Sequence, residues 1–269
     1  SFANSKKITI IGGGFIGCEI ASGARKLNKK VTLIEAGPSI LGRSVAPVFS
    51  KKIAQHHESQ GISILTNCKA TSINSNEVKT NLKNISTDLA IAGIGVIPNI
   101  RLASQAKLDI DNGIVVNKYL QTTNKNIFAI GDIANFPFNS ETGRLRLESI
   151  QNANDQAKIV ANNIIAIRIK KELLKYSPIP WFWSDQGDLK LQMAGIGNLH
   201  AKHHILQNQE KGTLTVLHFV NDQLVALDTM NHGLNHIYGR KLLSSNQIIS
   251  LDEINKFDGN LKSLVSHLN

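Results

Sequence analysis

Three glycines near the start of the chain have the spacing of a phosphate-binding turn. Gly12, Gly14 and Gly17 form a G-x-G-x-x-G pattern directly after a short apolar run. In such a turn the first glycine permits a tight bend, the second lets the backbone approach a pyrophosphate, and the third allows close packing of helix on strand. Phe15 and Ile16 would begin a helix whose N–H groups face the phosphates. These five residues form the predicted dinucleotide site, and the competing interpretation is a glycine-rich turn that binds nothing.

An acidic residue stands where a dinucleotide site of this kind would meet a ribose. Glu35 follows the second apolar run, 18 residues after Gly17. A carboxylate at this position accepts a hydrogen bond from a ribose 2'-hydroxyl and repels a 2'-phosphate. The sequence therefore predicts a preference for NADH over NADPH.

A second glycine-rich segment, residues 92–99, follows a later apolar run. It contains Gly95 and stops at Pro98. The carboxyl edge of a doubly wound sheet is where ligands bind, so Gly95 is a candidate cofactor contact. An ordinary turn accounts for the same residues equally well.

The elements that would position these residues follow from hydrophobic periodicity. Short runs of Ile, Val and Leu bounded by polar residues predict buried parallel strands at 7–11, 31–34 and 89–92. Amphipathic segments predict helices at 15–27 and 46–60, and further apolar patterns predict a strand at 62–65 and a hairpin within 70–82. This order is typical of a doubly wound α/β unit, which we place at residues 1–99.

The rest of the chain contains two segments with different predicted secondary structure. Residues 100–172 contain a predicted buried strand at 127–130 and one long helix at 148–169. Residues 173–269 follow a boundary marked by Pro178 and Pro180, and alternating patterns predict strands at 189–197, 203–208, 213–220 and 223–228 before helical signals. We expect a C-terminal α+β domain there.

The composition limits the classes of function. Lys and Arg outnumber Asp and Glu by 30 to 20, giving a formal charge of +10, which suits an acidic protein partner. The basic residues are scattered and not interleaved with aromatic residues, which disfavours nucleic acid. No apolar run is long enough to cross a membrane, and without a signal-peptide pattern we expect a cytoplasmic protein.

Cysteine and histidine contribute no predicted chemistry. Cys18 and Cys68 are far apart in the sequence, and we expect both to be buried. His200, His203 and His204 lack an acid or cysteine at ligand spacing, and the pair His232 and His236 lacks the Glu of a zinc protease helix. No metal site is predicted.

Five segments give the chain a specific resemblance to flavoprotein reductases of the ferredoxin reductase type, including rubredoxin reductases. They are GGGFIGCEIA at 12–21, GIGVIPN at 93–99, NIFAIGDIANF at 126–136, RLESIQNANDQAKIVANNI at 146–164 and PWFWSDQGDLKLQMAG at 180–195. The last one separates this group from most dithiol-containing disulfide reductases. The resemblance covers nearly the whole chain.

The resemblance implies roles for six further residues. Asp132 would bond the flavin ribityl chain, Gly131 would allow its close approach, and a helix starting at Ser149 or Ile150 would aim its N-terminus at the flavin. Glu19 would lie near the nicotinamide, and Trp183, with the rest of the matching segment 183–186, would close over the flavin. The competing interpretations are a first-turn helix acid for Glu19 and a buried aromatic core for Trp183.

One departure from the family pattern concerns flavin binding. Nothing before Lys7 resembles the FAD-binding unit with which such reductases open, so the resemblance implies that residues 100–172 are the second segment of a discontinuous, partial FAD-binding domain whose front segment is missing. We therefore expect a truncated chain, a proteolytic remnant or one subunit of a split enzyme, inactive alone, in which FAD binds weakly or not at all. Apolar surface on residues 113–135 would be exposed and would favour self-association.

The predicted parent enzyme transfers a hydride from NADH to FAD and then single electrons to an acidic 2Fe-2S ferredoxin or a rubredoxin that serves an oxygenase. The alternatives are a disulfide or peroxide reductase of the same superfamily, with its redox cysteine in the missing front segment, and a non-catalytic NADH-binding module.

Overall fold

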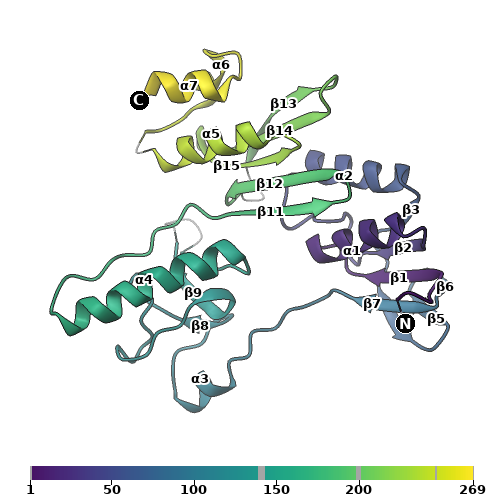
Figure 1. Ribbon diagram of the computed structural model, residues 1–269, viewed down its shortest axis with the longest axis horizontal. Coiled ribbons are helices and arrows are strands. Elements are labelled where there is room, and N and C mark those ends of the chain that lie inside the picture. Colours follow the sequence, from purple (N-terminus) through teal and green to yellow (C-terminus); the bar gives the residue numbers. More distant parts are fainter. Residues whose placement is uncertain (1, 139–142, 198–200, 246, 269) are drawn as a thin grey trace. The chain divides into compact units, whose positions relative to one another are not determined.

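The computed structural model describes residues 2–138, 143–197, 201–245 and 247–268. The chain divides into two compact units, and we call residues 1–95 with 183–269 unit 1 and residues 96–182 unit 2. Unit 1 is thus built from two segments that are distant in the sequence (Figure 1). The domain boundaries expected after residues 99 and 172 remain predictions. No helix in the described ranges is long and apolar enough to span a membrane.

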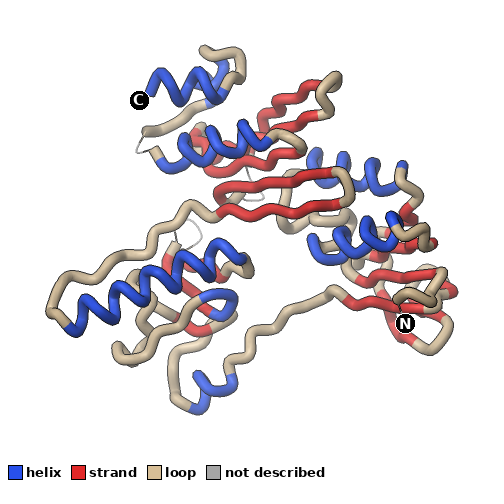
Figure 2. The backbone as a smooth tube through the Cα atoms, viewed as in Figure 1, coloured by secondary structure: helices blue, strands red, loops and turns tan. Residues whose placement is uncertain are grey.

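A parallel four-stranded sheet with the order β3-β2-β1-β7 forms the first part of unit 1. Its strands are β1 (Lys7–Ile11), β2 (Lys30–Ile34), β3 (Ile62–Leu65) and β7 (Leu89–Ala92), and its helices are α1 (Phe15–Lys26) and α2 (Pro47–Ser59). Figure 2 shows these helices beside the sheet. The predicted α/β architecture is confirmed, with the first strand in the interior of the sheet.

The other face of this sheet is covered by a small antiparallel sheet. Its strands are β4 (Ala70–Ile73), β5 (Glu77–Thr80) and β6 (Asn84–Ser86). Val78 and Ile85 from this sheet pack in one cluster with Ile11 and Ile34. The predicted hairpin is present, and β6 is an additional strand whose three residues are too short to show an alternating pattern.

The second part of unit 1 is an antiparallel sheet with the order β11-β12-β15-β14-β13. Its strands are β11 (Trp181–Gln186), β12 (Leu189–Gly195), β13 (Lys202–Asn208), β14 (Thr213–Val220) and β15 (Gln223–Met230). Helices α5 (Gly233–Ser244), α6 (Leu251–Asn255) and α7 (Leu261–Leu268) follow. The predicted α+β character is confirmed, although the sequence did not predict β11 as a strand.

Buried polar contacts join the two parts of unit 1. The Asp228 carboxylate on β15 accepts a hydrogen bond of 3.0 Å from the backbone N–H of Ala46, the N-cap residue of α2. The same carboxylate oxygen lies 2.9 Å from Nε2 of His218 on β14. Both side chains are almost fully buried, so the pair fixes the start of α2 against the C-terminal sheet.

Unit 2 is smaller and is organised around one long helix. It contains α3 (Arg101–Gln105), β8 (Ile114–Val115), a 3-10 helix η1 (Gly131–Ile133), β9 (Ala134–Pro137), β10 (Arg144–Arg146) and α4 (Ile150–Arg168). The strands form a sheet with the order β10-β9-β8. Val116, Leu120, Phe136 and Tyr176 belong to its core.

The prediction of a buried strand at residues 127–130 is wrong. These residues form only an isolated bridge, between Gln121 and Phe128, and Ile127 and Ile130 are 39% and 37% exposed. An apolar run indicates a strand only where neighbours complete the hydrogen-bond ladder, and the strand of this region is β9 instead. The expected exposed apolar surface is limited to part of 113–135, because Val116 and Leu120 are buried. Self-association remains a prediction.

Helix α4 buries a row of amide side chains. The side chain of Gln156 accepts a hydrogen bond from Gly131 N–H at 2.7 Å and donates to Asn152 at 3.1 Å. Asn152 also accepts from the Tyr176 hydroxyl at 2.9 Å. One turn before the helix end, Asn163 accepts from Leu174 N–H at 2.7 Å and donates to the carbonyl of Tyr119 at 3.2 Å. These amides satisfy backbone groups of the loops that pack on α4.

We expect Asn163→Ala to destabilise unit 2 by about 2–4 kcal/mol, because it leaves buried backbone groups without partners. Hydrogen exchange at the Leu174 amide would accelerate correspondingly, measured together with urea unfolding. Asn162→Ala is the matched control, since Asn162 is exposed and its amide donates to Lys158 O in its own helix at 2.8 Å. Equal effects of the two substitutions would contradict this role of Asn163.

Candidate functional site

The predicted dinucleotide turn has the geometry that its glycines indicate. Gly12 adopts a φ of +108°, and a Cβ atom there would collide with the carbonyl oxygen of Gly93. Gly14 is the N-cap of α1, and a Cβ built on it would meet no atom within 4 Å. Backbone around Gly14 is therefore open to a ligand at the positive end of the α1 dipole.

Glu35 lies beside this turn, directly after β2. Its Oε2 accepts a hydrogen bond from Gly13 N–H and its Oε1 accepts one from Gly37 N–H, each at 2.7 Å. The carboxylate therefore ties the glycine turn to the following loop. Each oxygen retains a second lone pair, so the carboxylate can still accept a ribose hydroxyl. Sequence reasoning identified Glu35 but missed its hydrogen bonds to the backbone of Gly13 and Gly37. Gly37, two residues after Glu35, is the one signal in the sequence that could have suggested such a turn.

Three further predicted nucleotide contacts lie at the carboxyl edge of the parallel sheet or just beyond it. Phe15 and Ile16 form the first turn of α1, where the Ile16 side chain is exposed. Gly95 is exposed three residues after β7, with no atom within 4 Å of a Cβ built on it. Their ligand contacts remain predictions.

Glu19 is brought next to the strand β11, 165 residues away in the sequence. The Ser184 hydroxyl donates a hydrogen bond to Glu19 Oε1. Trp183, the residue before Ser184, is 44% exposed, so a fully buried aromatic core does not describe it. The structure thus places Glu19 and the 183–186 segment at one location within unit 1.

Four of the predicted flavin-contacting residues lie in unit 2, while Trp183 belongs to unit 1. Gly131 has a φ of +71° and donates its N–H to Gln156, while Asp132 follows it on the surface. Helix α4 begins at Ile150 with Ser149 as its N-cap, as predicted, and the Ser149 hydroxyl accepts from Asn152 N–H at 3.1 Å. The first N–H groups of a helix have no partners within the helix, so this end can face an anionic group.

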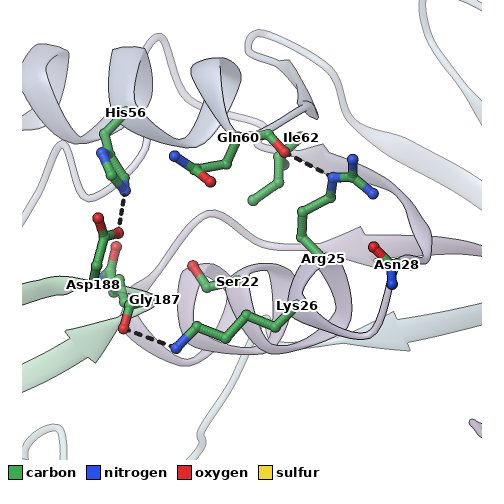
Figure 3. Close-up of a pocket in the computed structure, with 10 residues that line it drawn as sticks. Ser22, Arg25, Lys26, Asn28, His56, Gln60, Ile62, Gly187 and Asp188 are labelled. Atoms are coloured by element: carbon green, nitrogen blue, oxygen red, sulfur yellow. Dashed lines mark hydrogen bonds and ion pairs between the residues drawn. The ribbon is translucent and has the colours of Figure 1, made fainter.

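A pocket of about 410 Å³ lies elsewhere in unit 1, among the ends of α1 and α2 and the β11–β12 turn (Figure 3). Sequence reasoning did not predict it. Two of its basic side chains already have partners: Lys26 Nζ donates to Gly187 O at 3.0 Å, and His56 Nε2 lies 2.7 Å from Asp188 Oδ1. The pocket is lined by Ser22, Arg25, Lys26, Asn28, His56, Gln60, Ile62, Gln186, Gly187 and Asp188.

Neither cysteine is suited to redox chemistry in this fold. Both are buried, as predicted. Burial, with smaller contributions from the charges of Glu35 and Glu19, raises the pKa of the Cys18 thiol to about 12. The thiol is therefore protonated at neutral pH and is a poor nucleophile.

The histidines form no metal site in the part of the chain that the structure describes. His203 and His204 lie on β13, His232 is the N-cap of α5, and His236 is within α5. His200 lies outside the described residues.

Comparison with known proteins agrees with this architecture. The pyridine nucleotide-disulphide oxidoreductase family matches residues 2–157, and the reductase C-terminal family matches residues 181–265. Rhodocoxin reductase of Rhodococcus erythropolis is 34% identical over 99% of this chain, and a rubredoxin-NAD(+) reductase of Pseudomonas putida is 36% identical over 84%. The chain spans 62% and 59% of the lengths of these two relatives.

Solved structures show the same similarity. A ferredoxin reductase from Rhodopseudomonas palustris matches with a TM-score of 0.90 at 31% identity, over 98% of this chain and 66% of that one. The reductase of a covalent putidaredoxin reductase–putidaredoxin complex matches with a TM-score of 0.88 at 30% identity, over 97% of this chain and 64% of that one. Fold and sequence therefore agree that the chain belongs to the pyridine nucleotide-disulphide oxidoreductase family and carries the C-terminal domain of its ferredoxin reductase members.

Proposed function

We propose that this chain supplies the NADH-binding part and some of the flavin contacts of a ferredoxin reductase. The complete reaction would move a hydride from NADH to FAD and then single electrons to a 2Fe-2S ferredoxin or a rubredoxin. The observation that carries this proposal is the open glycine turn at the N-terminus of α1, braced by Glu35 at the adjoining strand end.

The nucleotide would lie across the carboxyl edge of the parallel sheet. Backbone N–H groups at Gly14 and the first turn of α1 would hold the pyrophosphate, since a Cβ built on Gly14 meets no described atom within 4 Å. Glu35 would accept the ribose 2'-hydroxyl, and the repulsion between its carboxylate and a 2'-phosphate would favour NADH over NADPH. Glu19, on the same helix, would lie at the nicotinamide end.

The flavin contacts would come mainly from unit 2. Gly131 and Asp132 form the turn at the start of η1, and Ser149 and Ile150 begin α4. The positive end of the α4 dipole would stabilise negative charge on a reduced flavin. FAD, when bound, accepts a hydride and can release electrons one at a time. Trp183 remains a predicted flavin contact.

The partner is proposed from charge and from the relatives. A net charge of +10 would attract an acidic ferredoxin and raise its rate of encounter. Among the proteins that match most of this chain are reductases named for rhodocoxin and rubredoxin and a structure of a putidaredoxin reductase complex. A disulfide reductase using this chain's own thiols is disfavoured, because both are buried and the pKa of Cys18 is about 12.

Glu35→Gln tests the nucleotide preference. We expect NADH to bind about tenfold more weakly, because a hydrogen bond to a charged group is lost, and the ratio of NADPH to NADH dissociation constants to fall as the repulsion disappears. Both constants can be measured by calorimetry. Glu58→Gln on the exposed surface of α2 makes the same change in charge and should leave the ratio unaltered. An unchanged ratio in Glu35→Gln would remove Glu35 from the ribose site.

NADH binding and flavin reduction test two parts of the proposal separately. We expect the chain to bind NADH in calorimetry but to bleach added FAD under anaerobic conditions no faster than free FAD with NADH, because FAD is expected to bind weakly or not at all. Gly12→Ala should abolish NADH binding, since its Cβ would collide with Gly93 O. Gly23→Ala, at an open position on α1, should retain it. Absence of NADH binding would contradict the proposed nucleotide site, and bleaching faster than the background would contradict the expectation that this chain is inactive alone.

A further inference from the structure

A chain of hydrogen bonds runs through the interior of unit 1 and ends at Glu19. Ser22 Oγ lies 3.3 Å from His57 Nδ1, and His57 Nε2 lies 2.8 Å from Gln186 Oε1. Gln186 Nε2 lies 3.2 Å from Ser184 Oγ, which donates to Glu19 Oε1. We call these five residues the relay. His57, Gln186 and Ser184 are at most 1% exposed, so their mutual contacts are shielded from water.

The direction of the relay follows from its chemistry. An amide oxygen only accepts, so His57 Nε2 must carry the proton that is donated to Gln186 Oε1. His57 Nδ1 is then the acceptor of the Ser22 hydroxyl proton. Burial, the largest cause, lowers the pKa of His57, and the adjacent His56 lowers it further against opposing effects of Gln186 and Asp188. His57 is therefore neutral at pH 7, in the single tautomer that the relay needs.

Every donor in the relay points the same way. The Gln186 amide donates to Ser184 Oγ, which leaves the Ser184 hydroxyl proton free to be donated to Glu19. Aligned hydrogen bonds in a low-dielectric interior polarise and strengthen one another. The sum of these dipoles is directed at the Glu19 carboxylate, which is the only anion in the relay.

The relay connects elements that are far apart in the sequence. Ser22 and Glu19 are on α1, His57 is on α2, and Gln186 and Ser184 are on β11. Ser22 and Gln186 also line the pocket in Figure 3, so the relay runs from the wall of that pocket to Glu19. An exposed glutamate on a helix normally samples several rotamers, and these contacts select one of them.

We propose that Ser184, Gln186 and His57 are positioning residues that hold the Glu19 carboxylate in one orientation at the nicotinamide end of the NADH site. This inference rests on the proposed function, which places Glu19 there. Glu19 lies five residues after the Gly14 N-cap, on the helix whose N-terminus would hold the pyrophosphate.

Calorimetric titration with NADH and with ADP-ribose tests the proposal, since ADP-ribose lacks the nicotinamide end. Ser184→Ala should raise the dissociation constant of NADH about fivefold, the effect of one lost hydrogen bond, and leave that of ADP-ribose unchanged. Glu19→Gln should also weaken the binding of NADH and not that of ADP-ribose. The double variant should bind NADH no more weakly than Glu19→Gln alone, because both changes act through one carboxylate. Equal losses for the two ligands, additive losses, or no loss in Ser184→Ala would overturn the proposal.

Two histidine variants provide a matched pair. His57→Phe should reproduce the selective loss of NADH affinity. His56→Phe removes the neighbouring imidazole, which pairs with Asp188 instead of Gln186, and should leave both affinities unchanged. A selective loss in His56→Phe as large as in His57→Phe would overturn the assignment.

The relay can also be tested without a ligand. Nitrogen-15 NMR of the wild-type chain should show His57 as the Nε2–H tautomer at pH 7, whereas the Nδ1–H tautomer would refute the direction of the relay. If wild-type protein bound neither NADH nor ADP-ribose while His57 showed the expected tautomer, the proposed function would fail and the relay would stand as a structural device only.

Discussion

The close approach of Gly12 to Gly93 is the constraint on which unit 1 is built. A side chain at Gly12 would occupy the position of the Gly93 carbonyl oxygen, so the turn after β1 can lie against the end of β7 only because Gly12 has none. This turn sets the starting point and direction of α1. It also places Gly13 N–H within reach of Glu35 and aligns Glu19 with β11.

Unit 1 combines two sequence segments through specific polar contacts as well as apolar packing. The carboxylate of Asp228 fixes the start of α2, and His57 near the end of α2 bonds Gln186. Apolar surfaces pack in many registers, whereas a buried hydrogen bond is favourable only in one. These contacts therefore define how the C-terminal sheet docks on the helices of the nucleotide-binding part.

The parts of the fold that could be predicted were those in which apolar residues face inward. The parallel strands and most of the extent of α4 follow directly from such local patterns, whereas the start of α4 at Ser149 was implied by the family resemblance. Strand β11 could not be predicted in this way, because its fully buried positions, Ser184 and Gln186, are polar. The apolar run at 127–130 led to the opposite error, because a buried strand was predicted there although Ile127 and Ile130 are partly exposed.

The same distinction applies to the candidate site. Gly12, Gly14 and Glu35 were identified because their roles depend on spacing within one βαβ segment. His57 gave no signal, because its hydrogen bond to Gln186 joins α2 and β11 across 129 residues and no local pattern encodes it. Ser184 and Gln186 belong to a segment that the family resemblance identified, but nothing in the sequence linked them to Glu19. The prediction of Glu19 came from family resemblance, and its bond to Ser184 became visible only in three dimensions.

The distribution of histidine gives the two units different tolerance of acid. All nine histidines lie in residues 1–95 and 183–269, while the interior of unit 2 is held by amides that do not titrate. Burial lowers the pKa of His57, and it lowers the pKa of His236 to about 4. In an unfolded chain a histidine takes up a proton at about pH 6.5, whereas His57 and His236 in the folded chain take one up only at lower pH. As the pH falls below about 6.5, proton binding therefore favours the unfolded form of unit 1. Mild acidification should therefore lower the free energy of unfolding of unit 1 while unit 2 keeps its packing.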